Sequence, residues 1–282
     1  MIKIEVDKFL NSIPKLSSDL VKGDLGKIAI FGGSSEYTGA PYFAGGADLV
    51  YIFCPESAAI PIKSYNPDLI VIPKLDNDID SCISWLKAMN SVIIGPGLGR
   101  NRNDDNIKRI YDECFRLNLP VIFDADGLGF IIKNTERIQL TDKCILTPNK
   151  LEFDRLIKEI LHKNPSNEVE DMKLLGKFLG NPIIIKKAVC VDNEASQKRC
   201  GGQGDMLAGM LAVMCHWGIK SNVEDPLFKA CIAASFTMRK LSFQAFTAHR
   251  RSLTGSKLIA ANLFIICASY LTDLIDVKEV QD

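Results

Sequence analysis

Seven short runs of apolar residues, rich in valine and isoleucine, divide the first two thirds of the chain. They lie at residues 27–31, 49–53, 69–72, 91–94, 120–123, 144–146 and 182–185. Each run is continuously apolar, which is typical of parallel strands covered on both faces. Stretches with helical spacing lie between several of them, at 79–89, 106–117 and 151–161. This alternation predicts an α/β fold, with a doubly wound, mostly parallel sheet and helices on both faces.

The pattern changes after Gln203. Three apolar-periodic segments follow, at about 205–218, 226–246 and 256–274, without a clear strand between them. We therefore expect the C-terminal third to be helical. No internal repeat, low-complexity tract or Pro/Gly/Ser-rich linker interrupts the chain. Residues 1–282 are accordingly expected to form a single domain.

Composition and charge favour a globular protein that acts on small molecules. Of the 282 residues, 47% are hydrophobic, and 34 basic residues balance 34 acidic ones. Because there is no basic excess, neither nucleic acid nor an anionic membrane surface is an expected partner. The apolar stretch 258–271 is also too short for a membrane span.

The nine cysteines are scattered and include no C-x-x-C pair. The N-terminal segment never builds the uninterrupted apolar core of a secretion signal. We therefore expect reduced thiols and a cytoplasmic protein, with a mitochondrial pool also open. None of the three histidines stands at zinc-ligand spacing from a cysteine pair, so a zinc site is not expected.

Glycines and polar side chains follow five of the predicted strands directly. In an open parallel sheet, ligands bind beyond these carboxyl ends. The segments are Gly32-Gly33, GPGLG at 95–99, DADG at 124–127, TPNKLE at 147–152 and Lys186-Lys187. One such loop could be plain turn chemistry. Five together predict a ligand site at one edge of the sheet.

The most informative stretch is RCGGQGD at 199–205, which precedes an apolar helical run. Glycines let backbone N–H groups approach an anion, and a helix start adds the positive end of its dipole. Asp205 could take a proton from a nucleophile or only cap the helix. Taken alone, the stretch is as consistent with a capped glycine turn as with a phosphate site.

Three further sets of residues each have two interpretations. Asp124 and Asp126 could touch a metal ion, or fix the turn and cap the next helix. Asn149 and Glu152 share one face of a helix start, where they could hold a water-coated Mg²⁺ or form a capping interaction. Lys187 could bind a nucleotide phosphate or be a solvated lysine.

Seven segments, in chain order, resemble the ATP-dependent NAD(P)H-hydrate dehydratases, a ribokinase-like family. They are FGGSSEYTGAPYFA at 31–44, GADLVYIF at 46–53, IKSYNPDLIVIPKLD at 62–76, IIGPGLGR at 93–100, FDADGL at 123–128, LTPNKLEF at 146–153 and KRCGGQGDMLAG at 198–209. YTGAPY, GPGLGR and RCGGQGD together are specific to these dehydratases, and RCGGQGD is similar to the eukaryotic, ATP-using branch. The epimerase domain that often precedes bacterial relatives is not expected here.

The resemblance implies a lyase that repairs a damaged cofactor. Water added across the 5,6 double bond of the nicotinamide ring leaves a hydroxyl at C6. ATP phosphorylates this hydroxyl in the S-form of the hydrate, and phosphate then departs to restore NADH or NADPH. ATP is thus implied as co-substrate and Mg²⁺ as cofactor.

Motif matching also implies roles for individual residues. Asp205 would be the general base, with Gly202 and Gly204 in the cradle for the transferring phosphoryl group. Asn149 and Glu152 would organise Mg²⁺, through water. Contacts with the hydrated nucleotide are implied for Gly97, Asn149, Lys150, Leu151, Glu152, Phe153, Asp154, Arg155 and Asp205. Contacts with ATP are implied for Lys187, Ser196, Gln197, Lys198, Arg199, Cys200, Gly201, Gly202, Gln203 and Gly204.

The chain departs from the family pattern in four places, one of which is Ala188, where the family has a glycine after the lysine. The usual longer helix is missing after Ala44, so that segment 34–48 only just reaches the length of a crossover between parallel strands. The hairpin before RCGGQGD is cut to 189–198, and a lysine, Lys257, replaces an acid near the end. Two other functions therefore stay open: a kinase that releases a phosphorylated alcohol, and a nucleotide-binding protein that has lost catalysis. Homo-oligomer formation also stays open.

Overall fold

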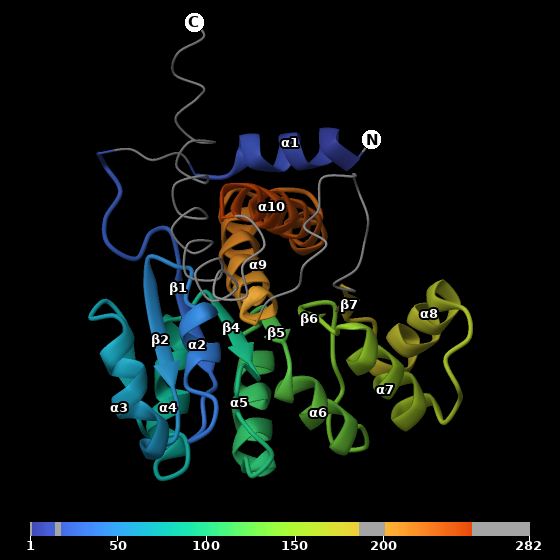
Figure 1. Ribbon diagram of the computed structural model, residues 1–282, viewed down its shortest axis with the longest axis horizontal. Helices are drawn as coiled ribbons and strands as arrows, with labels where there is room; N and C mark the ends of the chain where they lie inside the picture. Colours follow the sequence, from blue (N-terminus) through green and yellow to red (C-terminus); the bar gives the residue numbers. More distant parts are fainter. Residues whose placement is uncertain (1, 15–17, 186–200, 250–282) are drawn as a thin grey trace, which may run out of the picture.

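The computed structural model describes residues 2–14, 18–185 and 201–249, with the side chains of 6–14, 18–185 and 201–243 (Figure 1). Within these residues, seven parallel strands form one sheet in the order β3-β2-β1-β4-β5-β6-β7. The strands are β1 (Lys27–Phe31), β2 (Leu49–Phe53), β3 (Ile70–Ile72), β4 (Ser91–Ile94), β5 (Val121–Phe123), β6 (Cys144–Leu146) and β7 (Ile183–Ile184). The order reverses between β1 and β4, which confirms the predicted doubly wound topology.

Strand β1 shows why the predicted strands are apolar throughout. It pairs with β2 from Lys27↔Leu49 onward and with β4 on its other side. Successive residues face opposite sides of the sheet, so that Ile28 and Ile30 pack into one core while Ala29 and Phe31 pack into the other. Both faces are buried, and a polar residue on either would be left without water.

Helices cover both faces of the sheet (Figure 1). One core is closed by α9 (Gln203–Lys220) and α10 (Pro226–His249), with α1 (Ile2–Ser12) lying across α10, and by residues of α3 (Glu56–Tyr65). The other core is closed by α4 (Ile79–Ser84), α5 (Asp104–Arg116), α6 (Asp126–Lys133), α7 (Lys150–Leu161) and α8 (Glu168–Leu179). None of the described helices is long and apolar enough to cross a membrane.

Most predicted elements lie within three residues of their observed bounds. The segment 79–89 is α4 followed by a 3-10 turn, Trp85–Ala88, and the last predicted strand shrinks to the two residues of β7. Helix α1 was not predicted. Its Val6 and Phe9 are buried, but the charged residues between them obscure the apolar periodicity in the sequence. The predicted helix at 256–274 lies outside the described residues.

The short connection between β1 and β2 is long enough to link these two parallel strands. Its only helix, α2 (Gly39–Phe43), is five residues long and contacts α9. The backbone of Ala44 comes so near to α9 that its carbonyl oxygen lies 2.3 Å from the place a Cβ of Gly209 would take. An apolar cavity of about 540 Å³ remains beside this connection, lined in part by methionines of α9. The close approach lets so short a crossover reach β2 in register.

Candidate active site

Hydrogen bonds tie together the loops that follow β1, β4 and β5. The backbone N–H of Gly33 donates to the carbonyl oxygen of Pro96 at 2.9 Å, which joins the β1 loop to the β4 loop. The N–H of Gly99 donates to Oδ2 of Asp126 at 2.8 Å, which joins the β4 loop to the β5 loop. The loops after β1, β4 and β5 therefore form one connected surface, whereas Lys186 and Lys187 lie outside the described residues.

The two aspartates after β5 fix this surface. Asp124 is 1% exposed, and its Oδ1 accepts a hydrogen bond from the Thr147 hydroxyl at 2.7 Å. Ala125, between the aspartates, has a φ of 47°, an uncommon conformation for a residue with a side chain. Such strain is typical of functional sites. The sequence allowed these aspartates to contact a metal ion or to fix the turn. The hydrogen bonds in the structure are those of a fixed turn.

Gly97 and Arg102, in the loop after β4, make contacts that the sequence could not predict. The position of a Cβ on Gly97 would be 2.7 Å from the carbonyl oxygen of Tyr37, so the loop contacts the segment that leads into α2. The Arg102 side chain, 6% exposed, donates from Nη1 to the carbonyl oxygen of Gly99 at 3.2 Å and pairs with Asp104. Sequence reasoning assigned Arg102 no role; its place just after the glycine loop was the available signal.

The predicted substrate run 149–155 forms the start of α7. The Asn149 side chain accepts a hydrogen bond from the Glu152 N–H at 3.0 Å, and Glu152 Oε2 accepts one from the Asn149 N–H at 2.8 Å. This capping box confirms the capping interpretation of the pair. Lys150 and Arg155 are exposed, Leu151 is 80% exposed and Phe153 is buried in the core. Exposed and half-buried members of the run therefore face outward at the same sheet edge.

The glycine stretch forms the start of α9. Gly202 is the N-cap, with a φ of 90° that glycine adopts without strain, and the Met206 N–H donates to its carbonyl oxygen at 2.9 Å. Asp205 is half-buried in the first turn. Gly202 brings no side chain to cap this turn, and the first N–H groups of any α-helix have no acceptor within the helix. These N–H groups and the helix dipole favour an anion at this point.

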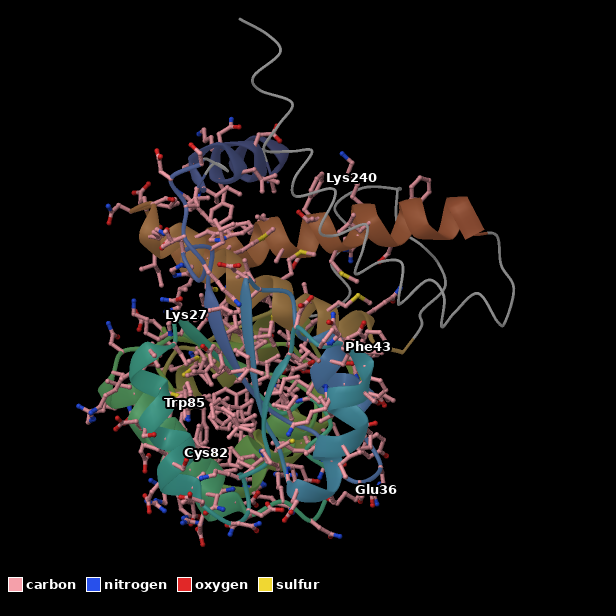
Figure 2. The ribbon with its side chains drawn as sticks, turned by 90° about the vertical axis from the view of Figure 1, so that its left-hand side faces the viewer. Lys27, Glu36, Phe43, Cys82, Trp85 and Lys240 are labelled. Carbon is pink, nitrogen blue, oxygen red and sulfur yellow. The ribbon has the colours of Figure 1, made fainter. Side chains whose placement is uncertain are left out.

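Phe43 of α2 lies against this turn. Its ring comes within 3.0 Å of the place a Cβ of Gly202 would take, at the amino-terminal end of α9 (Figure 2). The β1 loop, α2 and the glycine turn are thus in contact. The predicted ATP contacts Lys187, Ser196, Gln197, Lys198, Arg199 and Cys200, together with the trimmed hairpin, lie outside the described residues.

Sequence comparison decides the family. Residues 28–262 match a family model described as NAD(P)H-hydrate dehydratase. The chain belongs to this family. A mouse protein named ATP-dependent (S)-NAD(P)H-hydrate dehydratase is 40% identical over 280 residues, which cover 88% of this chain and 80% of the relative. The human protein of the same name is 39% identical over 282 residues, with 89% and 80% covered.

Solved structures agree on the fold of the family. The ADP/ATP-dependent NAD(P)H-hydrate dehydratase of Bacillus subtilis, co-crystallized with ATP/Mg²⁺, superposes with a TM-score of 0.65 at 18% identity, over 94% of this chain and 97% of that one. A ribokinase-like superfamily protein of Enterococcus faecalis gives 0.71 at 18% identity, over 94% and 95%. The predicted ribokinase-like architecture is confirmed.

Proposed function

We propose that this protein dehydrates the S-form of hydrated NADH or NADPH at the expense of ATP. The observation that carries the proposal is the start of α9, where Asp205 follows a glycine turn whose N-cap, Gly202, has no side chain, and this turn contacts α2. A carboxylate and a row of N–H groups are the two elements that phosphoryl transfer to a hydroxyl needs. The 40% identity to relatives named for this activity supports the same function.

In the first step, Asp205 accepts the proton of the hydroxyl on C6 of the hydrated nicotinamide ring. The hydroxyl oxygen then attacks the γ-phosphorus of ATP, and ADP leaves. A positioned general base contributes roughly 10²–10⁴-fold to such a transfer. Because Asp205 lies in the first turn of α9, its proton acceptor and the N–H groups of the turn approach the reacting centre from the same helix end.

The N–H groups of the Gly201–Gly204 segment stabilise the charge on the transferring phosphoryl group. Gly202 holds these groups in place because its left-handed conformation directs the chain into α9. A preorganised donor of this kind is typically worth about 3 kcal/mol of barrier. Lys187 and residues 196–200 would complete the contacts with ATP.

In the second step, phosphate leaves with the electron pair of its bond to C6, and a proton leaves C5. Hydroxide is a poor leaving group and phosphate is a good one, so ATP drives the dehydration. Gly97 and the outward-facing members of 149–155 would hold the ring over Asp205 while this happens, and the Gly99 N–H bond to Asp126 keeps the Gly97 loop in position.

Asn149 and Glu152 suit an outer-shell role toward Mg²⁺. The single side-chain oxygen of Asn149 and one carboxylate oxygen of Glu152 accept the hydrogen bonds of the capping box. No group of three His, Cys, Asp or Glu residues suited to a metal occurs in the part of the chain that the structure describes. Mg²⁺ usually keeps several waters and binds through one or two carboxylates plus substrate phosphates. When bound with ATP, it would neutralise phosphate charge.

A recovery assay tests this function. Purified protein is mixed with Mg²⁺, the S-epimer of hydrated NADH and either ATP or ADP, and absorbance is followed at the dihydronicotinamide band. We expect the absorbance to return with ATP. No recovery with either nucleotide would refute the proposal. A stable phosphorylated alcohol, detected by mass spectrometry, would instead indicate a kinase.

A further inference from the structure

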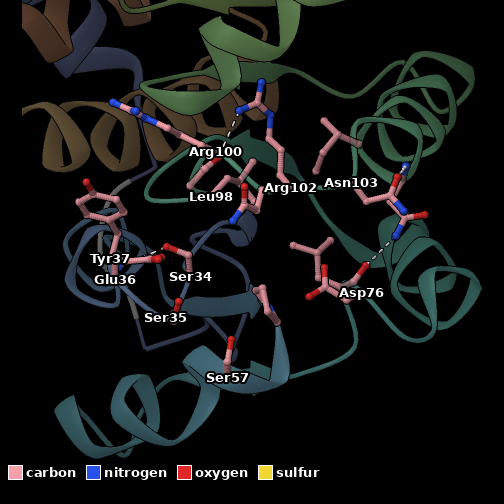
Figure 3. Close-up of a pocket in the computed structure, with 16 residues that line it drawn as sticks. Ser34, Ser35, Glu36, Tyr37, Ser57, Asp76, Leu98, Arg100, Arg102 and Asn103 are labelled. Atoms are coloured by element: carbon pink, nitrogen blue, oxygen red, sulfur yellow. Dashed lines mark hydrogen bonds between the residues drawn. The ribbon is translucent and has the colours of Figure 1, made fainter.

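The Arg102 side chain is buried between the loop after β4 and α6. Only 6% of it is exposed, which is rare for an arginine unless its guanidinium is fully paired. Its Nη2 atom lies 3.6 Å from the place a Cβ of Gly129 would take, so the guanidinium packs against α6. Its Nη1 atom donates to the carbonyl oxygen of Gly99 at 3.2 Å, the bond that a dashed line marks in Figure 3. Arg102 thus links the loop to α6.

The guanidinium of Arg102 is only partly paired. Its Nε atom lies 2.9 Å from Oδ1 of Asp104, which makes an ion pair. The geometry of this pair does not form a hydrogen bond, and Nη2 also has no acceptor within the described residues. Of the three guanidinium nitrogens, Nη1 alone therefore donates a hydrogen bond in the part of the chain that the structure describes.

Such incomplete pairing costs stability. A buried N–H group without an acceptor loses its hydrogen bonds to water and gains none in return. Replacing a buried ion pair by apolar residues of similar volume is often neutral or stabilising. Stability therefore does not explain why an arginine occupies position 102. An unsatisfied buried group of this kind needs another explanation.

Gly99 supplies that explanation. Arg102 donates to the carbonyl oxygen of Gly99, and the N–H of Gly99 donates to Asp126 at 2.8 Å. Gly99 is thus held on both sides, in a conformation with a φ of 76° that glycine adopts without strain. Leu98, which joins it to Gly97, is 4% exposed and fixed in the core. With these two residues fixed, the backbone of Gly97 has little freedom.

The same loop borders open space. A polar cavity of about 380 Å³ opens beside it, and Leu98 and Gly99 form part of the cavity wall (Figure 3). A backbone segment next to a cavity has fewer packed neighbours than one inside the core, so its position depends more on its hydrogen bonds. The bonds of Gly99 to Arg102 and Asp126 are of this kind.

We infer that Arg102 is a positioning residue for the hydrated nucleotide. Through the carbonyl group of Gly99, it holds Gly97 where the substrate contacts it, and it does so at a cost to stability. This division accounts for the pairing, because Nη1 serves the loop while Nε and Nη2 are buried along with it. The inference rests on the proposed function for its substrate.

Arg102→Met tests this role, since methionine is long and apolar and donates no hydrogen bond. We expect the Tm to stay level or rise, because the unpaired N–H groups are removed. The KM for the hydrated nucleotide should rise roughly tenfold in the recovery assay, within the 10²-fold that a misplacement of about 1 Å can cost, while kcat changes less. A lower Tm, a failure to fold or an unchanged KM would each overturn the inference.

Two further variants serve as rescue and control. Arg102→Lys keeps a donor for the Gly99 carbonyl and should restore most of the wild-type KM, whereas a KM equal to that of Arg102→Met would overturn the inference. Arg116→Met is the matched control. Arg116 is an exposed arginine in the last turn of α5 and donates two hydrogen bonds to Glu113. Its loss should leave the KM unchanged.

A double-mutant cycle tests whether Arg102 acts through Gly99. Arg102→Met and Asp126→Ala each remove one bond of Gly99, so the first loss should already loosen what the second would loosen. We expect the increase in KM of the double variant to be smaller than the product of the two single increases. An increase equal to that product would show that the two residues act on separate groups, and would overturn the inference.

Hydrogen exchange separates this inference from the proposed function, because it needs no turnover. Exchange of the backbone amides is followed by mass spectrometry in a peptide that spans residues 95–103. We expect it to be faster in Arg102→Met than in the wild-type protein and unchanged in Arg116→Met, with the core strands equally protected in all three. If the protein turned over neither hydrate, this result would still support the positioning of the loop. Unchanged exchange in Arg102→Met would overturn it.

Discussion

The ring of Phe43 lies against Gly202, with 3.0 Å between Cδ2 and the place a Cβ on Gly202 would take. The contact joins α2, which follows the β1 loop, to the N-cap of α9. The two residues are far apart in sequence, and only the tertiary structure brings them into contact. The glycine turn is therefore stabilised by the Phe43 ring as well as by its own backbone conformation.

Gly202→Ala should disrupt this turn. An alanine there would adopt a left-handed conformation that costs about 1–2 kcal/mol, and its Cβ would press on the Phe43 ring. We expect kcat to fall at least tenfold in the recovery assay. The double variant Gly202→Ala/Phe43→Leu should regain part of the loss, because the smaller side chain makes room. An additive effect of the two changes would argue against the contact.

Asp205→Asn should remove the proton acceptor and leave the N–H groups in place. We expect kcat to fall by several orders of magnitude while affinity for a non-hydrolysable ATP analogue, measured by calorimetry, stays nearly unchanged. An equal loss of nucleotide binding would show that Asp205 supports the turn instead of the chemistry.

Asp126→Ala should loosen the β4 loop. It leaves the N–H of Gly99 without its acceptor, a loss of about 1–3 kcal/mol where the group is buried. The KM for the hydrated nucleotide should rise more than kcat falls, because Gly97 belongs to the same loop. Asp126→Asn retains an acceptor oxygen and should restore most of the wild-type KM. If alanine and asparagine behave alike, the charge of Asp126 matters more than its hydrogen bond.

Gly209→Ala should destabilise the protein. Its Cβ would stand 2.3 Å from the Ala44 carbonyl oxygen, and overpacking of this kind typically costs about 1–3 kcal/mol. Gly176→Ala is the control, because nothing lies within 4 Å of a Cβ there and α8 gains a better helix former. The Tm should fall in the first variant and stay level or rise in the second. Equal Tm values would show that α2 can move away from α9.

The described cysteines should resist alkylation in the folded protein. Burial raises the pKa of Cys54 to about 12 and that of Cys82 to about 11. The thiolate is the reactive form, so both should stay protonated and unmodified by iodoacetamide at pH 8. Unfolding should expose them, and peptide mass mapping before and after denaturant measures the difference. Labelling of Cys54 in the native protein would show that the core opens.

The strand positions and the site edge could be predicted because parallel strands leave a signal in the sequence itself. Burial on both faces makes 27–31 and 91–94 apolar throughout, and the polar residues right after them must stand at one edge. Helix α1 escaped prediction because its apolar side faces α10, and that partner is not visible in the local pattern.

The roles of individual site residues were harder to predict because they depend on distant partners. Asp126 could have been a ligand or a turn residue until Gly99 was seen to donate to it. For Asn149 and Glu152 the sequence allowed both roles, and the capping box shows how the first turn of α7 is closed.

By itself, the sequence determined the doubly wound sheet and the family to which the chain belongs, and it predicted the sheet edge at which we propose that the ligands bind, because these follow from short-range patterns and motifs. Only the tertiary structure decided that Phe43 packs on Gly202 and that Asp126 and Arg102 hold Gly99 from both sides. These relationships join residues from different loops. Their geometry exists only once the sheet has brought the strand ends together.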